Sequence, residues 1–136
     1  MNSRITRLLA TLLVGLAWGS SAYAGCTNAQ LAGTWEAVFS DGNSCSLVLN
    51  KEGEVLIDEL NLSVCFDPFR GTTAPDEGSY VVTSDCSVTF DLVVEGLNVQ
   101  MYGRLAEPRN VGAGFFVAFV PDVYAGKGAF NLVRVE

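Results

Sequence analysis

Apolar and polar residues alternate along most of the chain after residue 32, with the period of two that marks a β-strand with one buried face. In the segment 86–94 every second residue is apolar, and Ser87, Thr89 and Asp91 lie between them. The segment 97–105 repeats this pattern after a Glu-Gly pair, which is typical of a tight hairpin turn. The two segments therefore predict an antiparallel hairpin with one face toward a core and one toward solvent.

The same pattern predicts short strands along the whole domain and only one helical turn, at 27–32. The predicted strands are 33–39, 45–50, 55–58, 78–83, 86–94, 97–105, 114–120 and 129–135, with 61–65 as a further candidate. Short connections favour strands that neighbour each other in sequence order. We therefore predict an all-β fold, an antiparallel up-and-down barrel of about eight strands, in preference to a sandwich.

Two segments depart from the alternation. The segment 66–78 contains two of the four prolines and is predicted to be a long surface loop. The strand 114–120 is apolar on both faces, so it is expected either to be covered on both sides or to carry an exposed apolar patch.

The first 24 residues have the features of a secretory signal peptide. Arg4 and Arg7 precede an apolar run, which ends before the small-residue site at 22–24. The run is shorter than the roughly 20 residues that span a bilayer. We predict a signal peptide at 1–24 and a single domain at 25–136, with an uncut membrane anchor as the alternative.

The charge is strongly acidic. The chain has 8 basic and 15 acidic residues, and removal of Arg4 and Arg7 leaves a net charge near −9. Binding to nucleic acid or to an anionic membrane depends on clustered Lys and Arg. Neither is expected as a partner, and the mature form is not expected to insert into a membrane.

Four cysteines remain in the predicted domain, namely Cys26, Cys45, Cys65 and Cys86. An even number in a small exported domain predicts two disulfides, with three possible pairings. A lipoprotein-type cut after Gly25 would instead acylate Cys26 and leave one other cysteine unpaired. We therefore predict an exported protein, periplasmic or extracellular, and favour a disulfide over a lipid anchor at Cys26.

The sequence offers no convincing catalytic, metal or cofactor site. It contains no His and no G-x-S-x-G motif. The acidic pairs 58–59 and 76–77 consist of adjacent residues, which point to opposite faces of a strand. Calcium near Asp67, Asp76 and Glu77 is a minor alternative, because oxygen ligands are present without a spaced loop motif.

The motif Gly33-Thr34-Trp35 at the start of the first predicted strand, together with Arg134 in the last, resembles the lipocalin and calycin barrels. The resemblance implies that Trp35 closes the barrel floor and that Arg134 stacks across its indole. A cation over an indole contributes about 0.5–2 kcal/mol, so the pair would be structural. The segment 77–90 is also similar to a pattern in uncharacterised secreted lipocalin-like barrels.

The segment "AQLAGTWEAVFSDGNSCSLVLN", with Cys65 downstream, is similar to secreted inhibitors of bacterial metalloproteases. This resemblance implies a Cys45–Cys65 disulfide, which leaves Cys26 to pair with Cys86. It also implies inhibition by an N-terminal arm. Only residues 25–32 precede the predicted barrel, so loops are favoured over an arm for any inhibitory contact.

The predicted loop supplies the candidate recognition residues Phe66, Phe69 and Arg70. Aromatic and Arg side chains are enriched at interface hot spots. The alternative is that both Phe side chains fold back and plug the barrel mouth.

The interior of an eight-stranded barrel is just wide enough for its own side chains or for one small ligand. The inward-facing residues are predicted to be bulky: Trp35, Phe39, Leu47, Leu49, Phe90, Leu92 and Met101. A filled interior favours a non-enzymatic binding barrel that recognises a protein partner, such as a protease, through its loops. The alternatives are a carrier of a small hydrophobic ligand and a small-barrel enzyme of the cyclase type.

Overall fold

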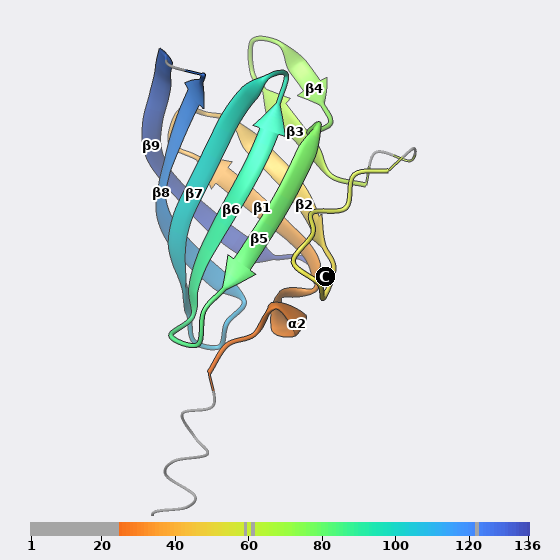
Figure 1. The fold of residues 1–136 in the computed structure, drawn as a ribbon, viewed down its shortest axis with the longest axis vertical. Coiled ribbons are helices and arrows are strands. Elements are labelled where there is room, and N and C mark those ends of the chain that lie inside the picture. The colour runs from red at the N-terminus through yellow and green to blue at the C-terminus, as the bar shows by residue number, and fades with distance from the viewer. Residues whose placement is uncertain (1–24, 59, 61, 122) are drawn as a thin grey trace, which may run out of the picture.

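The computed structural model of the chain describes residues 25–58, 60, 62–121 and 123–136. The predicted signal peptide at 1–24 lies outside the described residues. The described part contains a short helix and nine strands (Figure 1). They are α2 (Asn28–Leu31), β1 (Gly33–Phe39), β2 (Ser44–Leu49), β3 (Val64–Asp67), β4 (Gly71–Thr73), β5 (Glu77–Val82), β6 (Ser87–Val94), β7 (Leu97–Ala106), β8 (Val111–Val120) and β9 (Val123–Arg134).

The strands form one antiparallel sheet in the order β4-β3-β2-β1-β9-β8-β7-β6-β5. Neighbours in the sheet are neighbours in sequence, except that β1 pairs with β9 and so joins the two ends of the chain. The sheet curls until β5 comes back toward β2 and β3 (Figure 1). The predicted all-β, up-and-down barrel fold is confirmed.

The residues 53–56 join the two sides of the curled sheet. Val55 bridges to Leu49 at the end of β2, and Glu54 bridges to Ser79 in β5. The amide of Tyr80 also donates a hydrogen bond to the Gly53 carbonyl at 2.8 Å. The strand predicted at 55–58 is thus reduced to a short bridge, which closes only one end of the barrel.

The segment 66–78 is not the long loop that its prolines predicted. It contains the end of β3, the whole of β4 and the start of β5. The carboxylate of Asp67 accepts a hydrogen bond from the Phe69 amide at 2.8 Å, and the Arg70 amide donates to the Asp67 carbonyl at 3.2 Å. Gly71 then takes φ +90°, a conformation that favours glycine. Asp, Pro and Gly therefore build a tight hairpin turn between β3 and β4.

We call the end of the barrel beside α2 the floor. Trp35 is fully buried there, and its indole N–H donates to the Leu31 carbonyl of α2 at 2.8 Å. The Arg134 guanidinium lies 4.5 Å from the indole centroid and donates to the carbonyl oxygens of Gln30 and Ala32. The indole and the guanidinium therefore both hold α2 across the floor.

The Tyr80 side chain attaches the same helix from the opposite side of the barrel. Its hydroxyl lies within hydrogen-bond distance of two carbonyl oxygens, that of Asn28 at 2.9 Å and that of Asn50, and its one proton is shared between them. Burial is the main cause that raises the pKa of Tyr80, the charge of Glu52 raises it further, and Arg134 opposes this. The ring is buried and stacks near Phe90, so its role at the floor is structural.

Gly33 begins the floor motif because no other residue fits its backbone. Its φ is +135°, in the region that L side chains rarely adopt. A Cβ at this position would also overlap the Glu136 carbonyl oxygen and approach the Arg134 guanidinium. The glycine of the G-x-W motif thus lets the end of the chain cross beside the start of β1.

Two disulfides are present, as predicted, and they pair Cys26 with Cys86 and Cys45 with Cys65. This is the pairing that the resemblance to the metalloprotease inhibitors implies. In this structure the Cys26 sulfur is therefore not free to carry a lipid. Two disulfides are typical of an oxidising, exported environment.

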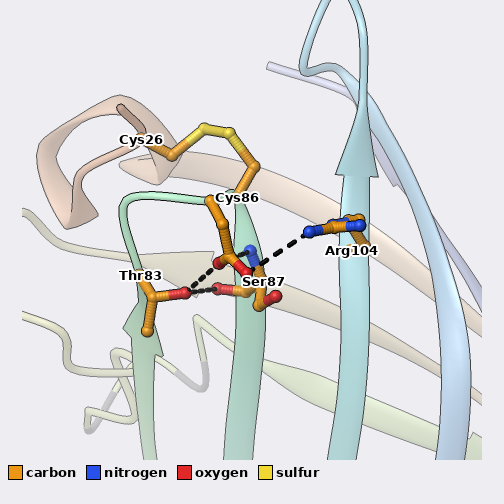
Figure 2. Close-up of polar contacts among 6 residues, drawn as sticks. Cys26, Thr83, Cys86, Ser87 and Arg104 are labelled. Carbon is orange, nitrogen blue, oxygen red and sulfur yellow. Dashed lines mark hydrogen bonds and ion pairs between the residues drawn. A yellow bond between two sulfur atoms is a disulfide. The ribbon is translucent and has the colours of Figure 1, made fainter. Parts of the chain in front are cut away.

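The Cys26–Cys86 disulfide ties the start of the domain to the β5–β6 turn, where Thr83, Ser87 and Arg104 surround a carboxylate (Figure 2). That carboxylate, Asp85, accepts from the Thr83 hydroxyl, from the Ser87 amide at 3.1 Å and from Arg104 at 3.3 Å. The Thr83 hydrogen bond is the main cause that lowers the pKa of Asp85 to about 2.

Among the described residues, no helix is long and apolar enough to cross a membrane.

Candidate ligand cavity at the barrel mouth

The barrel is hollow at the end opposite the floor, which we call the mouth. A cavity of about 400 Å³ opens there. It is lined by the last residues of β1, β6 and β8, by the first residues of β2, β7 and β9, and by residues of β3 and β4. Its apolar lining consists of Phe39, Cys45, Cys65, Phe66, Leu92, Val94, Leu97, Val99, Phe116, Ala118, Val120 and Ala125.

The cavity lies where several inward-facing side chains at the same height of the barrel are small. Near the middle of the barrel the interior is filled by Phe90, Met101 and Phe130, all buried. Closer to the mouth, inward positions are held by small residues such as Cys45 on β2, Val99 on β7 and Ala118 on β8. The predicted filled interior is therefore wrong for this half of the barrel, although it describes the floor half.

Aromatic rings form the inner end of the cavity. Phe39 packs edge-on against Phe116, with ring centroids 5.0 Å apart, and lies 6.4 Å from Phe130 below it. Edge-to-face aromatic pairs add about 0.5–1.5 kcal/mol to the burial of the rings. The inner wall is thus fixed by packing and offers a molecule in the cavity a rigid apolar surface.

The Cys45–Cys65 disulfide forms part of the side wall. The two residues face each other in the register of β2 and β3, and both line the cavity. Because β3 carries the β3–β4 hairpin, this covalent link holds one side of the mouth in place.

Polar residues are gathered at the rim. Asp41 and Asn43 lie in the turn between β1 and β2, where the Asp41 carboxylate accepts from the Asn43 amide at 3.0 Å. Arg70, in the β3–β4 turn, forms an ion pair of 3.8 Å with Glu95 in the β6–β7 turn. Both side chains of this pair are largely exposed, so it links two turns across the mouth without closing it.

The predicted recognition residues all lie at this end of the molecule. Phe66 and Arg70 line the cavity, whereas Phe69 points away from it at the tip of the hairpin and is 95% exposed. Phe66 is about half exposed. Neither ring plugs the mouth, so the alternative of a barrel plugged by these side chains is wrong.

The remaining polar groups give no catalytic arrangement in the described part of the chain. Asp76 precedes β5 and Glu77 is its first residue, at the edge of the sheet. Glu59, the partner of Asp58 in the other acidic pair, lies outside the described residues. No group of three or more Cys, Asp or Glu side chains there is arranged to hold a metal ion. The cavity has an apolar body with polar groups at its entrance, an arrangement suited to binding.

Four residues of the cavity wall, Leu97, Val99, Phe116 and Ala118, were not predicted from the sequence as site residues. The alternation had shown which residues of β7 face inward. The available signal was the presence of small residues, Val99 and Ala118, at inward positions of two neighbouring strands.

Comparison with known proteins gives little further information. No family model matches the chain, and no curated protein matches it, so the resemblance to secreted metalloprotease inhibitors gains no support. A crystal structure of a shwanavidin variant in complex with biotin is similar in fold. It is 12% identical in sequence, with a TM-score of 0.49, over 77% of this chain and 97% of that chain.

Proposed function

We propose that this protein is an exported, non-enzymatic barrel that binds one small, largely apolar molecule in the mouth cavity. The observation that carries the proposal is the cavity of about 400 Å³, which lies within the range of about 300–1,000 Å³ typical of ligand sites. The apolar wall would supply most of the binding free energy through the hydrophobic effect. The carboxylates, amide and guanidinium at the rim would orient a polar end of the molecule.

The size of the cavity limits the ligand to one small molecule. The polar rim favours a molecule with one apolar end and one polar end, because the apolar end can reach Phe39 and Phe116 while the other remains hydrated. A carrier or sequestering function outside the cytosol would fit this arrangement. We propose that the protein acts in the periplasm or in the surrounding medium.

Native mass spectrometry of the freshly purified exported protein tests this function. We expect a fraction of the protein to carry one additional small molecule, which organic solvent extracts from the protein. The same analysis of the Ala118→Leu variant, which extends a side chain into the cavity, should show that fraction reduced. A single apo mass in both samples, whatever the growth medium, would count against a carrier.

A second candidate function rests on Phe69. A phenylalanine that is 95% exposed at the tip of a hairpin, next to Arg70, has the composition of an interface hot spot. We infer from this that the hairpin could contact a protein partner, for which secreted proteases are one class. Inhibition assays with secreted proteases test this candidate, with the Phe69→Ser variant as the matched control. Equal protease activity with and without micromolar wild-type protein argues against it.

A further inference from the structure

The outer surface of β8 carries an unusual set of apolar residues. The outward-facing positions of this strand hold Val111, Ala113, Phe115, Val117 and Phe119. In the register of the sheet they are flanked by Tyr102 on β7 and by Tyr124, Ala129 and Val133 on β9. We call these nine residues the β8 stripe.

The β8 stripe is exposed and partly pre-organised. Phe115, at its centre, is 57% exposed, and Tyr124, at its mouth end, is 61% exposed. The rings of Phe115 and Tyr102 stack with centroids 5.3 Å apart, which fixes a flat aromatic surface. Val111, Phe115, Tyr124 and Val133 are each at least 40% exposed, so the stripe is a contiguous exposed apolar patch of the kind that marks interaction sites.

The charge around the stripe differs from the charge of the whole molecule. The chain has a net charge of −7, yet β8 contains no charged residue, and β9 contains no acidic one. The flanking outward positions beyond the stripe hold the amides Asn98, Gln100 and Asn131 and the basic residues Arg104 on β7 and Lys127 on β9, with no carboxylate among them. Two copies could therefore meet through this face without placing carboxylates against each other, which the acidity of the chain would otherwise oppose.

We propose that the β8 stripe is the contact surface between two copies of this chain, packed face to face as a two-fold symmetric dimer. A stripe along one strand is self-complementary, because a two-fold axis near Phe115 places each half of the stripe against the other half in the partner. The apolar centre, with amides and the basic residues Arg104 and Lys127 at its edge, corresponds to the usual core and polar rim of an interface.

The dimer leaves the mouth cavity accessible, since successive residues of β8 point to opposite sides of the sheet. Ala118 lines the cavity, whereas Phe119, beside it, belongs to the stripe. The dimer proposal is therefore independent of the proposed ligand and can be tested without it.

Sedimentation velocity of the exported protein, with both disulfides intact, tests the dimer over a range of concentrations up to about 200 μM. We expect a dimer with a micromolar dissociation constant in the wild-type protein and at least ten-fold weaker association in Phe115→Glu. Val81→Glu is the matched control, because Val81 is also 57% exposed but lies on β5. It should associate as the wild type does.

Salt gives a second readout that needs no variant. Screening of the net negative charge should strengthen the association as the salt concentration rises from about 0.05 to 0.5 M, whereas a contact made by ion pairs would weaken. If circular dichroism shows that Phe115→Glu is not folded, Phe115→Ser replaces it in the sedimentation experiment. A wild-type monomer at about 200 μM, a dimer weakened by salt, or a Phe115 variant that associates like the wild type would each overturn the proposal.

Discussion

The two ends of this barrel are built from the same strands but in opposite ways. At the floor, large side chains fill the interior, and Trp35, Tyr80 and Arg134 hold α2 across it with hydrogen bonds to carbonyl oxygens. At the mouth, small side chains such as Val99 and Ala118 leave a cavity, and the ion pair that spans its entrance joins the exposed groups of Arg70 and Glu95. The difference indicates that stability is concentrated at the floor, which leaves the mouth free to bind.

The largest change in stability is expected from a substitution that disrupts the floor. Trp35→Ala should lower the free energy of unfolding by about 3–5 kcal/mol, because it removes a fully buried indole and leaves a void beneath α2. Urea denaturation measures the change. Ala118→Leu, at the mouth, is the matched comparison and should cost much less, because its added atoms enter existing space. A loss below about 1 kcal/mol in Trp35→Ala would show that the floor is not the main source of stability.

The next effect concerns the mouth wall. Replacement of both Cys45 and Cys65 by Ser should cost roughly 3 kcal/mol, the value expected for a cross-link between residues 20 apart in sequence. Because this disulfide holds β3 beside the cavity, the variant should also bind an apolar probe more weakly. Replacement of both Cys26 and Cys86 by Ser should lower the free energy of unfolding and leave probe binding unchanged. Equal loss of probe binding in both variants would argue against a local role for Cys45 and Cys65.

A smaller effect is expected from the ion pair at the rim. Arg70→Ala should change the free energy of unfolding by at most about 1 kcal/mol, since both side chains of the pair are largely exposed. The substitution should nevertheless change the rate of probe binding, because the β3–β4 and β6–β7 turns at the entrance are then no longer linked by the ion pair. Stopped-flow mixing measures the rate, with Arg104→Ala at the floor end as the control. Identical rates in the two variants would exclude the rim pair from ligand entry.

The smallest expected effect is on the pH dependence of stability at acidic pH. Asp85 has a pKa near 2 in the folded protein, below the roughly 3.9 of an unperturbed Asp. Its carboxylate therefore stabilises the folded state fully above about pH 4, and this contribution is lost as the pH falls toward 2. Thermal melts of the wild type and Thr83→Val should diverge above pH 4 and converge near pH 2. Parallel curves over this range would mean that the Thr83 hydroxyl does not lower the pKa of Asp85.

The sequence predicted the fold well because the alternation of period two is repeated in nearly every strand. The hairpin of β6 and β7 matches its predicted limits to within one residue, and Val88, Phe90 and Leu92 are buried as the alternation predicts. The helical turn at 27–32 and the two disulfides were likewise predictable from local signals.

Two features could not be obtained from the alternation alone. The β3–β4 hairpin was interpreted as a loop because β4 has only three residues, too few to show a period, although Asp67, Pro68 and Gly71 are typical of a turn. The cavity depends on which side chains meet at the same height in the barrel. That information comes from the register between strands, which places Ala118 of β8 opposite Val99 of β7 and not opposite a large side chain.

The outer face of β8 was also only partly predictable from the sequence. The strand 114–120 was expected to be covered on both faces or to carry an exposed patch, and the structure shows an exposed patch. Sequence alone could not choose between these alternatives, because the choice depends on whether another element packs over β8.

The central claim, that the mouth cavity binds a small apolar molecule, is tested most directly by titration of the exported protein with a neutral, environment-sensitive fluorophore. We predict saturable binding of one probe per chain with a dissociation constant of about 1–100 μM. Ala118→Leu should weaken binding about ten-fold or more, because the added side chain competes for the same space. Ala106→Leu, outward-facing on β7 near the floor, and Phe115→Glu, in the β8 stripe, should bind as the wild type does. Absence of saturable binding, or equal affinity in Ala118→Leu and the wild type, would contradict the claim.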